Sequence, residues 1–327
     1  MTELVNKDIS EQYYIDRDGN QVPIPVSNNA LIEKMFAHTL TRGIMKMVSA
    51  PWYANLQRAV MSSFVSTFWI TKFVRQNGIR LREYKKKKYT SFHDFFKREI
   101  KPESRPFTVD ERALLSPCDC KASVYRIADN SCFAIKGVPY TVEELLGEGA
   151  RNEANAGRTV HEAIAAGSDA VSEYEEPKSL ASLYRDGYLF LLRLSLDDYH
   201  HYMFPVSGDK SEDMMIPGKL YTVHPLIHKY CAVYRENARQ FCTVTTPAGN
   251  CVLVMQVGAL GVGKIVNDNM DAAVVAQGEE QGHFEFGGST ILVLVPGGSY
   301  VPEERLLANT EAGFETIVKM GERIGTL

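Results

Sequence analysis

The stretch FEFGGSTILVLV, residues 284–295, places a serine directly after two glycines and before an unbroken apolar run. The hydroxyl of Ser289 could attack the carbonyl of the preceding residue and exchange that amide for an ester. Gly288 suits this reaction because no side chain shields its carbonyl and its backbone tolerates strained angles. Elimination from the ester would cut the chain and lead to a pyruvoyl group, whose ketone can form a Schiff base with an amine. The other interpretation of the glycines is a β-bulge at the start of a strand.

A serine hydroxyl is a weak nucleophile, so this reaction needs a base and an acid that orients the base. The segment LDDYHHY supplies Asp198, His200 and His201 directly after an apolar strand, and LLSPCDCKASVY places Asp119 between two apolar segments. Taken singly, such residues are often structural, as an aspartate in a turn or a histidine at a strand end. Together they predict an Asp–His–Ser set.

Short strands are the elements that must position these residues. From about residue 106, apolar runs alternate with Gly and Pro at strand-like intervals: ALLSP, ASVYRI, YLFLLRLS, VTTPAGNCVLVMQVGALGVGKIV, AAVVAQG and ILVLVP. Residues 143–186 interrupt the pattern with an acidic, Ala-rich, partly helical stretch, which indicates an insertion or lid. We therefore expect an α+β fold, with a β-rich catalytic domain at 105–327 and an N-terminal region at 1–104.

The N-terminal region is predicted to be a loosely packed arm (1–29) with one hairpin, followed by amphipathic helices (30–104). Gly78 is a plausible stop for the second helix. The 13 uncharged residues between Arg58 and Lys72 are too few to cross a bilayer, which takes roughly 20 apolar residues. They are long enough to lie in the interface, with the aromatic side chains sunk among acyl chains: Phe64, Phe68, Trp69 and Phe73.

Charge is unevenly distributed along the chain. Residues 30–105 hold 16 Lys and Arg against 5 Asp and Glu, a balance of +11, whereas the remainder holds 20 and 35, a balance of −15. Lys85 to Lys88 form a cluster directly after the aromatic segment, which favours an anionic membrane surface as partner. A solvated charge run is the simpler interpretation of the lysines alone, and no nucleic-acid-binding signature accompanies them.

Other potential sites are weak. The six cysteines form no disulfide framework and the N-terminus lacks the apolar stretch of a signal peptide, so we expect a reducing compartment. Cys118 and Cys120 are interpreted as core residues, and His224 and His228 as non-ligands, so no metal site is predicted. GALGVGKI has the glycine spacing of a phosphate-binding loop, but Ile265 replaces the magnesium-binding hydroxyl and strand residues follow.

From residue 89 to the C-terminus the sequence resembles the phosphatidylserine decarboxylases, pyruvoyl enzymes that cleave themselves at a Gly-Ser bond. The shared motifs occur in the family's order: YTSFHDFFKREIKPESRPF, LLSPCDCKASVY, GYLFLLRLSLDDYHHY, IPGKLYTVHP, VGALGVGKIV, GEEQGHFEFGGSTILVLV and EAGFETIVKMGERIG.

The resemblance implies a site and a reaction. Asp119, His200 and Ser289 match the family's self-cleaving triad, and cleavage between Gly288 and Ser289 would give a beta chain (1–288) and an alpha chain (289–327). The covalent cofactor would be a pyruvoyl group made from Ser289. The implied activity is that of a carboxy-lyase, converting phosphatidylserine to phosphatidylethanolamine and carbon dioxide at the periphery of a membrane, on its cytoplasmic face. An oligomer is compatible with the sequence.

Departures from the family's pattern leave alternatives open. Met203 stands where many members carry a second histidine, His201 replaces an arginine, and Cys120 replaces a glycine. Either His200 or His201 could therefore protonate the decarboxylated carbon. Residues 150–185 are longer than the family's loop. A soluble amino acid as substrate, an inactive lipid-binding relative and a phosphate-loop nucleotide binder are the alternative functions.

Overall fold

The structure is a computed structural model of the 327-residue chain. It describes residues 13–24, 51–86, 88–147, 179–221, 223, 232–259, 264–285 and 289–327, with side chains omitted at 51–55. Gly288, His224, His228, the whole of the stretch 30–50 that was expected to be helical, and most of the 150–185 insertion lie outside these residues.

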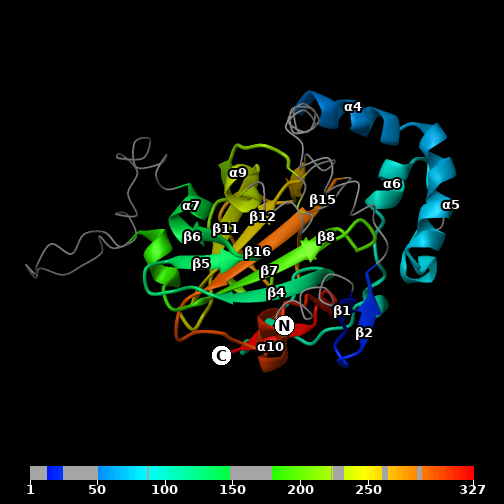
Figure 1. Cartoon of the computed structure of the whole chain (residues 1–327). Helices are drawn as coiled ribbons and strands as arrows, with labels where there is room; N and C mark the ends of the chain where they lie inside the picture. Colours follow the sequence, from blue (N-terminus) through cyan, green and yellow to red (C-terminus); the bar gives the residue numbers. More distant parts are fainter. Residues whose placement is uncertain are drawn as a thin grey trace, which may run out of the picture.

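A large, mostly antiparallel sheet forms the centre of the molecule (Figure 1). Its strand order is β14-β9-β11-β12-β16-β7-β4-β18-β1-β2, and β10 pairs with β11. The bounds are β1 (Tyr13–Ile15), β2 (Gln21–Pro23), β4 (Cys120–Arg126), β7 (Tyr188–Leu194), β9 (Gly208–Lys210), β10 (Met214–Ile216), β11 (Arg239–Thr245), β12 (Cys251–Val257), β14 (Ala273–Val275), β16 (Ser289–Val295) and β18 (Thr316–Val318).

Smaller sheets complete the strand-rich body. One has the order β13-β15-β8, one has the order β17-β19-β3, and β5 pairs with β6. Their bounds are β3 (Ala113–Leu115), β5 (Cys132–Ile135), β6 (Val138–Thr141), β8 (His201–Met203), β13 (Ile265–Asn267), β15 (Glu280–Phe284), β17 (Val301–Pro302) and β19 (Arg323–Thr326).

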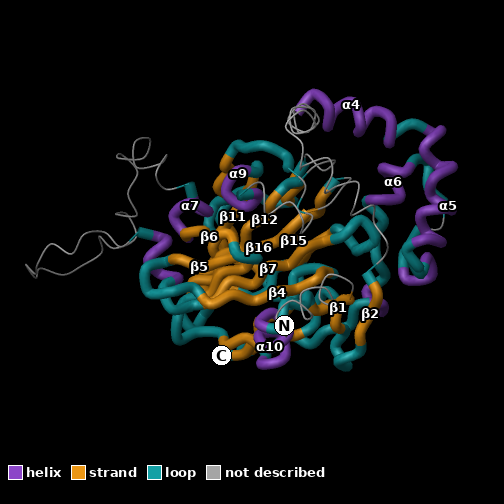
Figure 2. Tube along the Cα trace, viewed as in Figure 1, coloured by secondary structure: helices purple, strands orange, loops and turns teal. Residues whose placement is uncertain are grey.

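Helices lie around this body (Figure 2). They are α4 (Pro51–Met61), α5 (Thr67–Gln76), α6 (Phe92–Phe96), α7 (Val142–Leu146), α9 (Val233–Glu236) and α10 (Glu304–Glu311), with short 3-10 turns at Phe64–Ser66, Leu81–Glu83, Pro102–Ser104 and Leu180–Tyr184. Helices α4, α5 and α6 form a separate group beside the ends of β8 and β15 (Figure 1). The helices that the structure describes are too short or too polar to span a membrane.

The α5 helix ends where its sequence predicts. Gly78 adopts a left-handed φ of +63°, and Ile79 N–H donates to the Val74 carbonyl at 3.1 Å. Glycine reaches this conformation without steric cost, so it closes the helix. Phe73 is directed inward rather than toward solvent, because its ring packs edge-on against Phe92 and Phe95 at 5.2 and 6.1 Å. The expectation that Phe73 meets acyl chains is therefore wrong.

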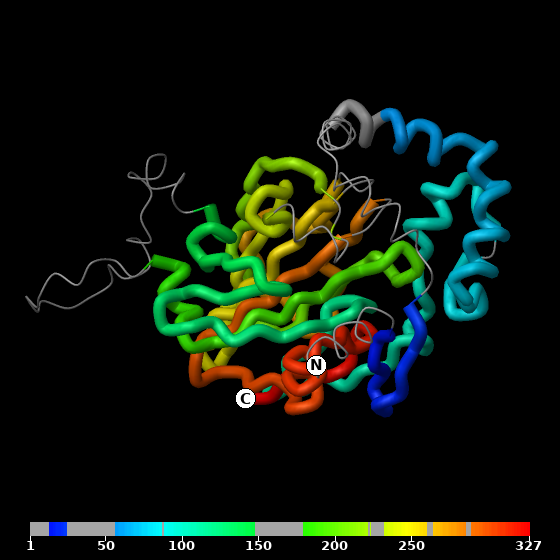
Figure 3. The backbone as a smooth tube through the Cα atoms, viewed as in Figure 1, coloured from blue at the N-terminus to red at the C-terminus, as the bar shows by residue number. Residues whose placement is uncertain are grey.

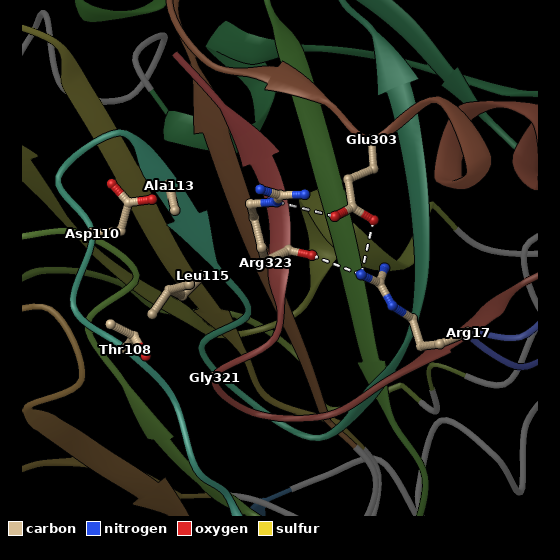
Figure 4. A pocket seen from close by; sticks show the side chains of 8 residues that line it. All are labelled: Arg17, Thr108, Asp110, Ala113, Leu115, Glu303, Gly321 and Arg323. Carbon is tan, nitrogen blue, oxygen red and sulfur yellow. Dashed lines mark hydrogen bonds and ion pairs between the residues drawn. The ribbon is translucent and has the colours of Figure 1, made fainter.

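The N-terminal arm is more firmly attached than expected. It forms the predicted hairpin, in which β1 pairs with β2, but β1 also extends the main sheet by pairing in parallel with β18 (Figure 3). The side chain of Arg17 donates to the Arg323 carbonyl and forms an ion pair with Glu303 at 2.8 Å. These three residues line a polar surface pocket (Figure 4), to which Asp119, His200 and Ser289 do not contribute.

The central sheet buries both of its faces. One face packs under β5, β6, α7 and α9 and includes Leu292 and Leu294 of β16; we call it the α7 face. The other packs under β8, β15, α10 and β19 and includes Ile291 and Val293; we call it the β8 face. Burial on both faces explains why β16 is a continuous apolar run instead of an alternating one.

Candidate active site

Strand register brings Asp119 and Ser289 to the edge of the sheet from which the turn carrying His200 departs. Asp119 directly precedes β4, His200 follows β7, and Ser289 begins β16. Because β7 runs antiparallel to both neighbours, the start of β4, the end of β7 and the start of β16 coincide. With adjacent strands about 4.8 Å apart, Asp119 and Ser289 lie on either side of the end of β7, roughly 10 Å apart. His200 lies in the turn that leads from this end of β7 into β8.

Ser289 is enclosed at this edge. It pairs with Leu194 across the strands and is 0% exposed. Its Oγ has no hydrogen-bond partner among the described residues. A buried hydroxyl without a partner costs about 1–3 kcal/mol, so its retention needs a reason beyond packing. Such a hydroxyl is free to react, which fits the precursor of a group formed from this side chain.

The His200 ring is held by its neighbours in one tautomer. Its Nδ1 lies 2.9 Å from the carbonyl oxygen of Asp198. A carbonyl only accepts, so Nδ1 must carry a proton, and in the neutral ring Nε2 carries the lone pair. The ring also packs against Phe96, with centroids 4.1 Å apart, and is completely buried. His200 therefore presents Nε2 as a base.

The turn that carries His200 depends on residues that the sequence did not single out. Arg98, 1% exposed, donates from Nη2 to the Asp197 and Asp198 carbonyls at 3.1 and 2.9 Å. Lys121 binds both carboxylate oxygens of Asp198, at 2.8 and 2.7 Å. The charge and hydrogen bonds of Lys121 lower the pKa of Asp198 against the opposing effect of burial. The one sequence signal for Arg98 was its place in the motif FHDFFKREIKPESRPF.

Asp119 occupies a cationic setting. Its carboxylate accepts from Arg105 Nε at 2.8 Å and Nη2 at 2.5 Å, and from Met320 N at 2.9 Å. Lys319 Nζ lies 3.4 Å away. Burial alone would raise the pKa of Asp119, but Arg105 and Lys319 together lower it, so the carboxylate is ionised. The carboxylate of Asp119 is thus bonded to Arg105 and Met320. The Nδ1 of His200 is bonded to the carbonyl of a different aspartate, Asp198.

His201 lies in a different environment from His200. Its Nδ1 is 2.6 Å from Glu280 Oε1, and its Nε2 is 3.3 Å from the Lys97 carbonyl. Its ring stacks on Tyr199 and on His283, with centroids 5.0 Å apart in each case. Both ring nitrogens are therefore occupied by acceptors. The two histidines therefore differ in the groups that bind their rings.

The other residues considered as potential sites lie in the core, beside a strand or outside the described part of the chain. No group of three or more His, Cys, Asp or Glu side chains there could hold a metal ion. Cys118 and Cys120 are buried in the core as expected, and burial raises the pKa of Cys118. A strand, β13, follows the phosphate-loop-like glycines, as predicted, although residues 260–263 lie outside the described residues.

Comparison with known proteins places the chain in a family. The family model described as phosphatidylserine decarboxylase matches residues 92–326. The phosphatidylserine decarboxylase proenzyme 2 of Clostridium acetobutylicum is 32% identical to the chain, over 98% of the chain and 97% of that protein. The phosphatidylserine decarboxylase proenzyme of Chlamydia caviae is 31% identical, over 95% and 97% respectively.

These matches extend beyond the motifs and include the N-terminal region, which the motifs alone left out. They confirm the resemblance drawn from the sequence. The chain belongs to the phosphatidylserine decarboxylase family, a family of carboxy-lyases.

Proposed function

We propose that this chain is a proenzyme that cleaves itself between Gly288 and Ser289 and then decarboxylates phosphatidylserine to phosphatidylethanolamine. The observation that carries the proposal is the fully buried hydroxyl of Ser289 at the start of β16, which has no hydrogen-bond partner in the described part of the chain. It lies at the same edge of the sheet as the oriented imidazole of His200 and the ionised carboxylate of Asp119.

Self-cleavage follows from the chemistry of these groups. His200 Nε2 removes the Ser289 hydroxyl proton as Oγ attacks the Gly288 carbonyl carbon, and the amide nitrogen leaves with a proton to give an ester. Loss of the Ser289 Cα proton then breaks the ester C–O bond, which leaves a carboxylate on Gly288 and dehydroalanine at 289. Addition of water and release of ammonia complete the pyruvoyl group.

Asp119 supports this reaction through charge. In the proposed role its carboxylate, fixed by Arg105 and Met320, stabilises the imidazolium that His200 becomes when it takes a proton. The bond from Nδ1 to the Asp198 carbonyl keeps the ring from rotating. The two contributions, charge and orientation, come from separate residues.

Decarboxylation uses the same base in its protonated form. The pyruvoyl ketone supplies the electron sink that a substrate amine needs to lose its carboxylate. His200 Nε2 then delivers the proton that replaces carbon dioxide on the substrate carbon. His201 is less suited to this step because Glu280 and the Lys97 carbonyl occupy its nitrogens.

Membrane contact is proposed through an apolar patch on α4, the adjoining 3-10 turn and α5. Its members are at least 45% exposed: Leu56, Val60, Phe64, Val65, Phe68 and Trp69. Exposed aromatic and branched side chains in one place are typical of an interface with lipid or protein. Lys85 and Lys86 lie nearby in sequence, but they form ion pairs with Glu99 at 2.9 Å and Asp94 at 2.6 Å. The apolar side chains therefore carry more of the proposed binding than these lysines.

The test is release of labelled carbon dioxide from phosphatidylserine carrying the label in its serine carboxyl group. Purified protein should release it from vesicles, and Ser289→Ala should release none. Free serine and other soluble amino acids are assayed in parallel. Turnover of an amino acid but not of the lipid would show that the substrate is a soluble amino acid. Turnover of neither would refute the proposal.

A further inference from the structure

Beside Ser289 lies a buried amide that the mechanism above does not use. Gln256 on β12 is 0% exposed, and neither its Nε2 nor its Oε1 has a hydrogen-bond partner among the described residues. A glutamine amide offers two donors and an accepting oxygen, and burying all of them unpaired is costly. An apolar residue of the same size would be more stable at this position, so the amide points to a ligand.

Register places this amide on the face of Ser289. Gln256 pairs with Ile291, which belongs to the β8 face, and Ser289 lies two residues before Ile291 on the same side of β16. Diagonal neighbours of this kind lie about 7–8 Å apart at Cα, within reach of a long side chain. The same register sets Gly258 beside Ser289, so β12 contributes no side chain next to the hydroxyl.

Two further buried amides have different partners. Gln281 on β15 is 2% exposed, and its Oε1 has no partner among the described residues, although its Nε2 lies 3.5 Å from Cys242 Sγ. Gln240, the neighbour of Gln256 on β11, has its Nε2 2.7 Å from Asp213 Oδ2. Of the paired amides Gln256 and Gln240, the one on the strand next to β16 is therefore unpaired, and the one a strand farther away is satisfied.

We propose that the Gln256 amide donates to the carboxylate of the serine headgroup and so selects phosphatidylserine. This inference rests on the proposed function. A serine headgroup differs from its ethanolamine product only by this carboxylate, so a donor is needed that recognises it. A neutral amide among apolar side chains suits a group that must be lost, because a cation would stabilise the carboxylate in the ground state and oppose its departure.

Two substitutions at one position test the assignment in the self-cleaved enzyme. Gln256→Leu should leave self-cleavage complete and the Tm unchanged or higher, because it removes an unpaired buried group. Its kcat/KM for phosphatidylserine should fall roughly 10- to 100-fold, the range for a lost hydrogen bond to a charged group. Inhibition by phosphatidylethanolamine, which has no carboxylate, should change little. Gln256→Glu, similar in shape but without the donors, should lose more activity than Gln256→Leu.

Gln240→Leu is the matched control, since it makes the same change one strand away. It should lower the Tm by removing one of the donors to Asp213, which keeps Asn267 and Lys210, and it should keep kcat/KM within a few-fold. The proposal is overturned if Gln256→Leu retains kcat/KM, fails to self-cleave, or weakens phosphatidylethanolamine inhibition as much as turnover. Greater activity in Gln256→Glu than in Gln256→Leu would also overturn it, because the amide would then act as an acceptor. Failure of the parent enzyme on phosphatidylserine in the same assay would instead refute the proposed function.

Discussion

At the scale of single residues, the proposed chemistry depends on which histidine can accept a proton. The Nδ1 of His200 is bonded to a carbonyl, which fixes the lone pair on Nε2, whereas both nitrogens of His201 are bonded to acceptors. The sequence DDYHHY cannot distinguish the two, because most of the groups that contact the rings, such as Glu280, Lys97 and Phe96, come from distant segments of the chain.

We expect His200→Ala to slow self-cleavage by at least 100-fold, the lower range for loss of a general base. Asp119→Ala should also block it, because the imidazolium loses its counter-charge. His201→Ala should cleave at nearly the rate of the parent. The measurement is a time course of chain cleavage in freshly synthesised protein. If His201→Ala stays uncut while His200→Ala is processed, the two histidines must exchange roles.

At the scale of elements, the small sheet of β8 and β15 carries a built-in pH dependence. Burial, followed by the nearby charge of His201, lowers the pKa of His283 to about 4. The groups that act on it also include Lys97, Glu285 and Glu280. Folded His283 is therefore neutral between pH 6.5 and 4, while the unfolded chain binds a proton there, so folding stability falls as pH drops through this window.

We expect this effect to cost about 1–3 kcal/mol between pH 7 and pH 4.5, given 1.36 kcal/mol per pKa unit and partial exposure to solvent. His283→Gln should reduce the loss by that amount. The free energy of unfolding is measured in urea at both pH values, in an uncut Ser289→Ala background so that a single chain unfolds. An equal loss with and without the histidine would assign the pH dependence to other groups.

The helical elements carry the membrane prediction. Phe64 and Phe68 are 73% and 77% exposed, and burying each in lipid is worth about 1.5–3 kcal/mol. Replacing both with serine should weaken binding to anionic vesicles more than tenfold at low and at high salt. Replacing Lys85 to Lys88 with glutamine should weaken it only at low salt, because screening shortens the reach of surface charge. Self-cleavage should survive both changes.

Vesicle sedimentation measures these differences. Val274→Ser is the matched control, since Val274 is an apolar residue 80% exposed on β14, away from the patch. It should bind vesicles as well as the parent does. If the double phenylalanine variant binds equally well, α4 and α5 are not the docking surface.

At the scale of the whole molecule, sequence patterns identified the long, buried strands and only some of the short ones, such as β3 and β14. Apolar runs such as ILVLV predicted β16 because a strand buried on both faces has a continuous signal. β8 and β18 contain three residues each, too few for a period to show. The pairing of β1 with β18 joins residues about 300 positions apart, and no local pattern records such a contact.

The candidate site was predictable in part for similar reasons. Asp119, His200 and Ser289 follow from reactive residue types and family motifs. Gln256 and Arg98 do not, since a glutamine in an apolar strand and an arginine in a basic segment look unremarkable until their burial and partners are known. The pairing of β4 and β16 with β7, which brings Asp119 and Ser289 to one edge of the sheet, also cannot be read from the sequence.

The central claim, that the chain converts its own Ser289 into the reactive group, is tested most directly by the intact mass of purified, active protein under denaturing conditions. We expect two polypeptides, residues 1–288 and 289–327, with the smaller resistant to N-terminal sequencing because a pyruvoyl group replaces its amine. Ser289→Ala should give one full-length mass and no activity. A single uncut mass in active parent protein, or a small chain with a free N-terminal serine, would contradict the account.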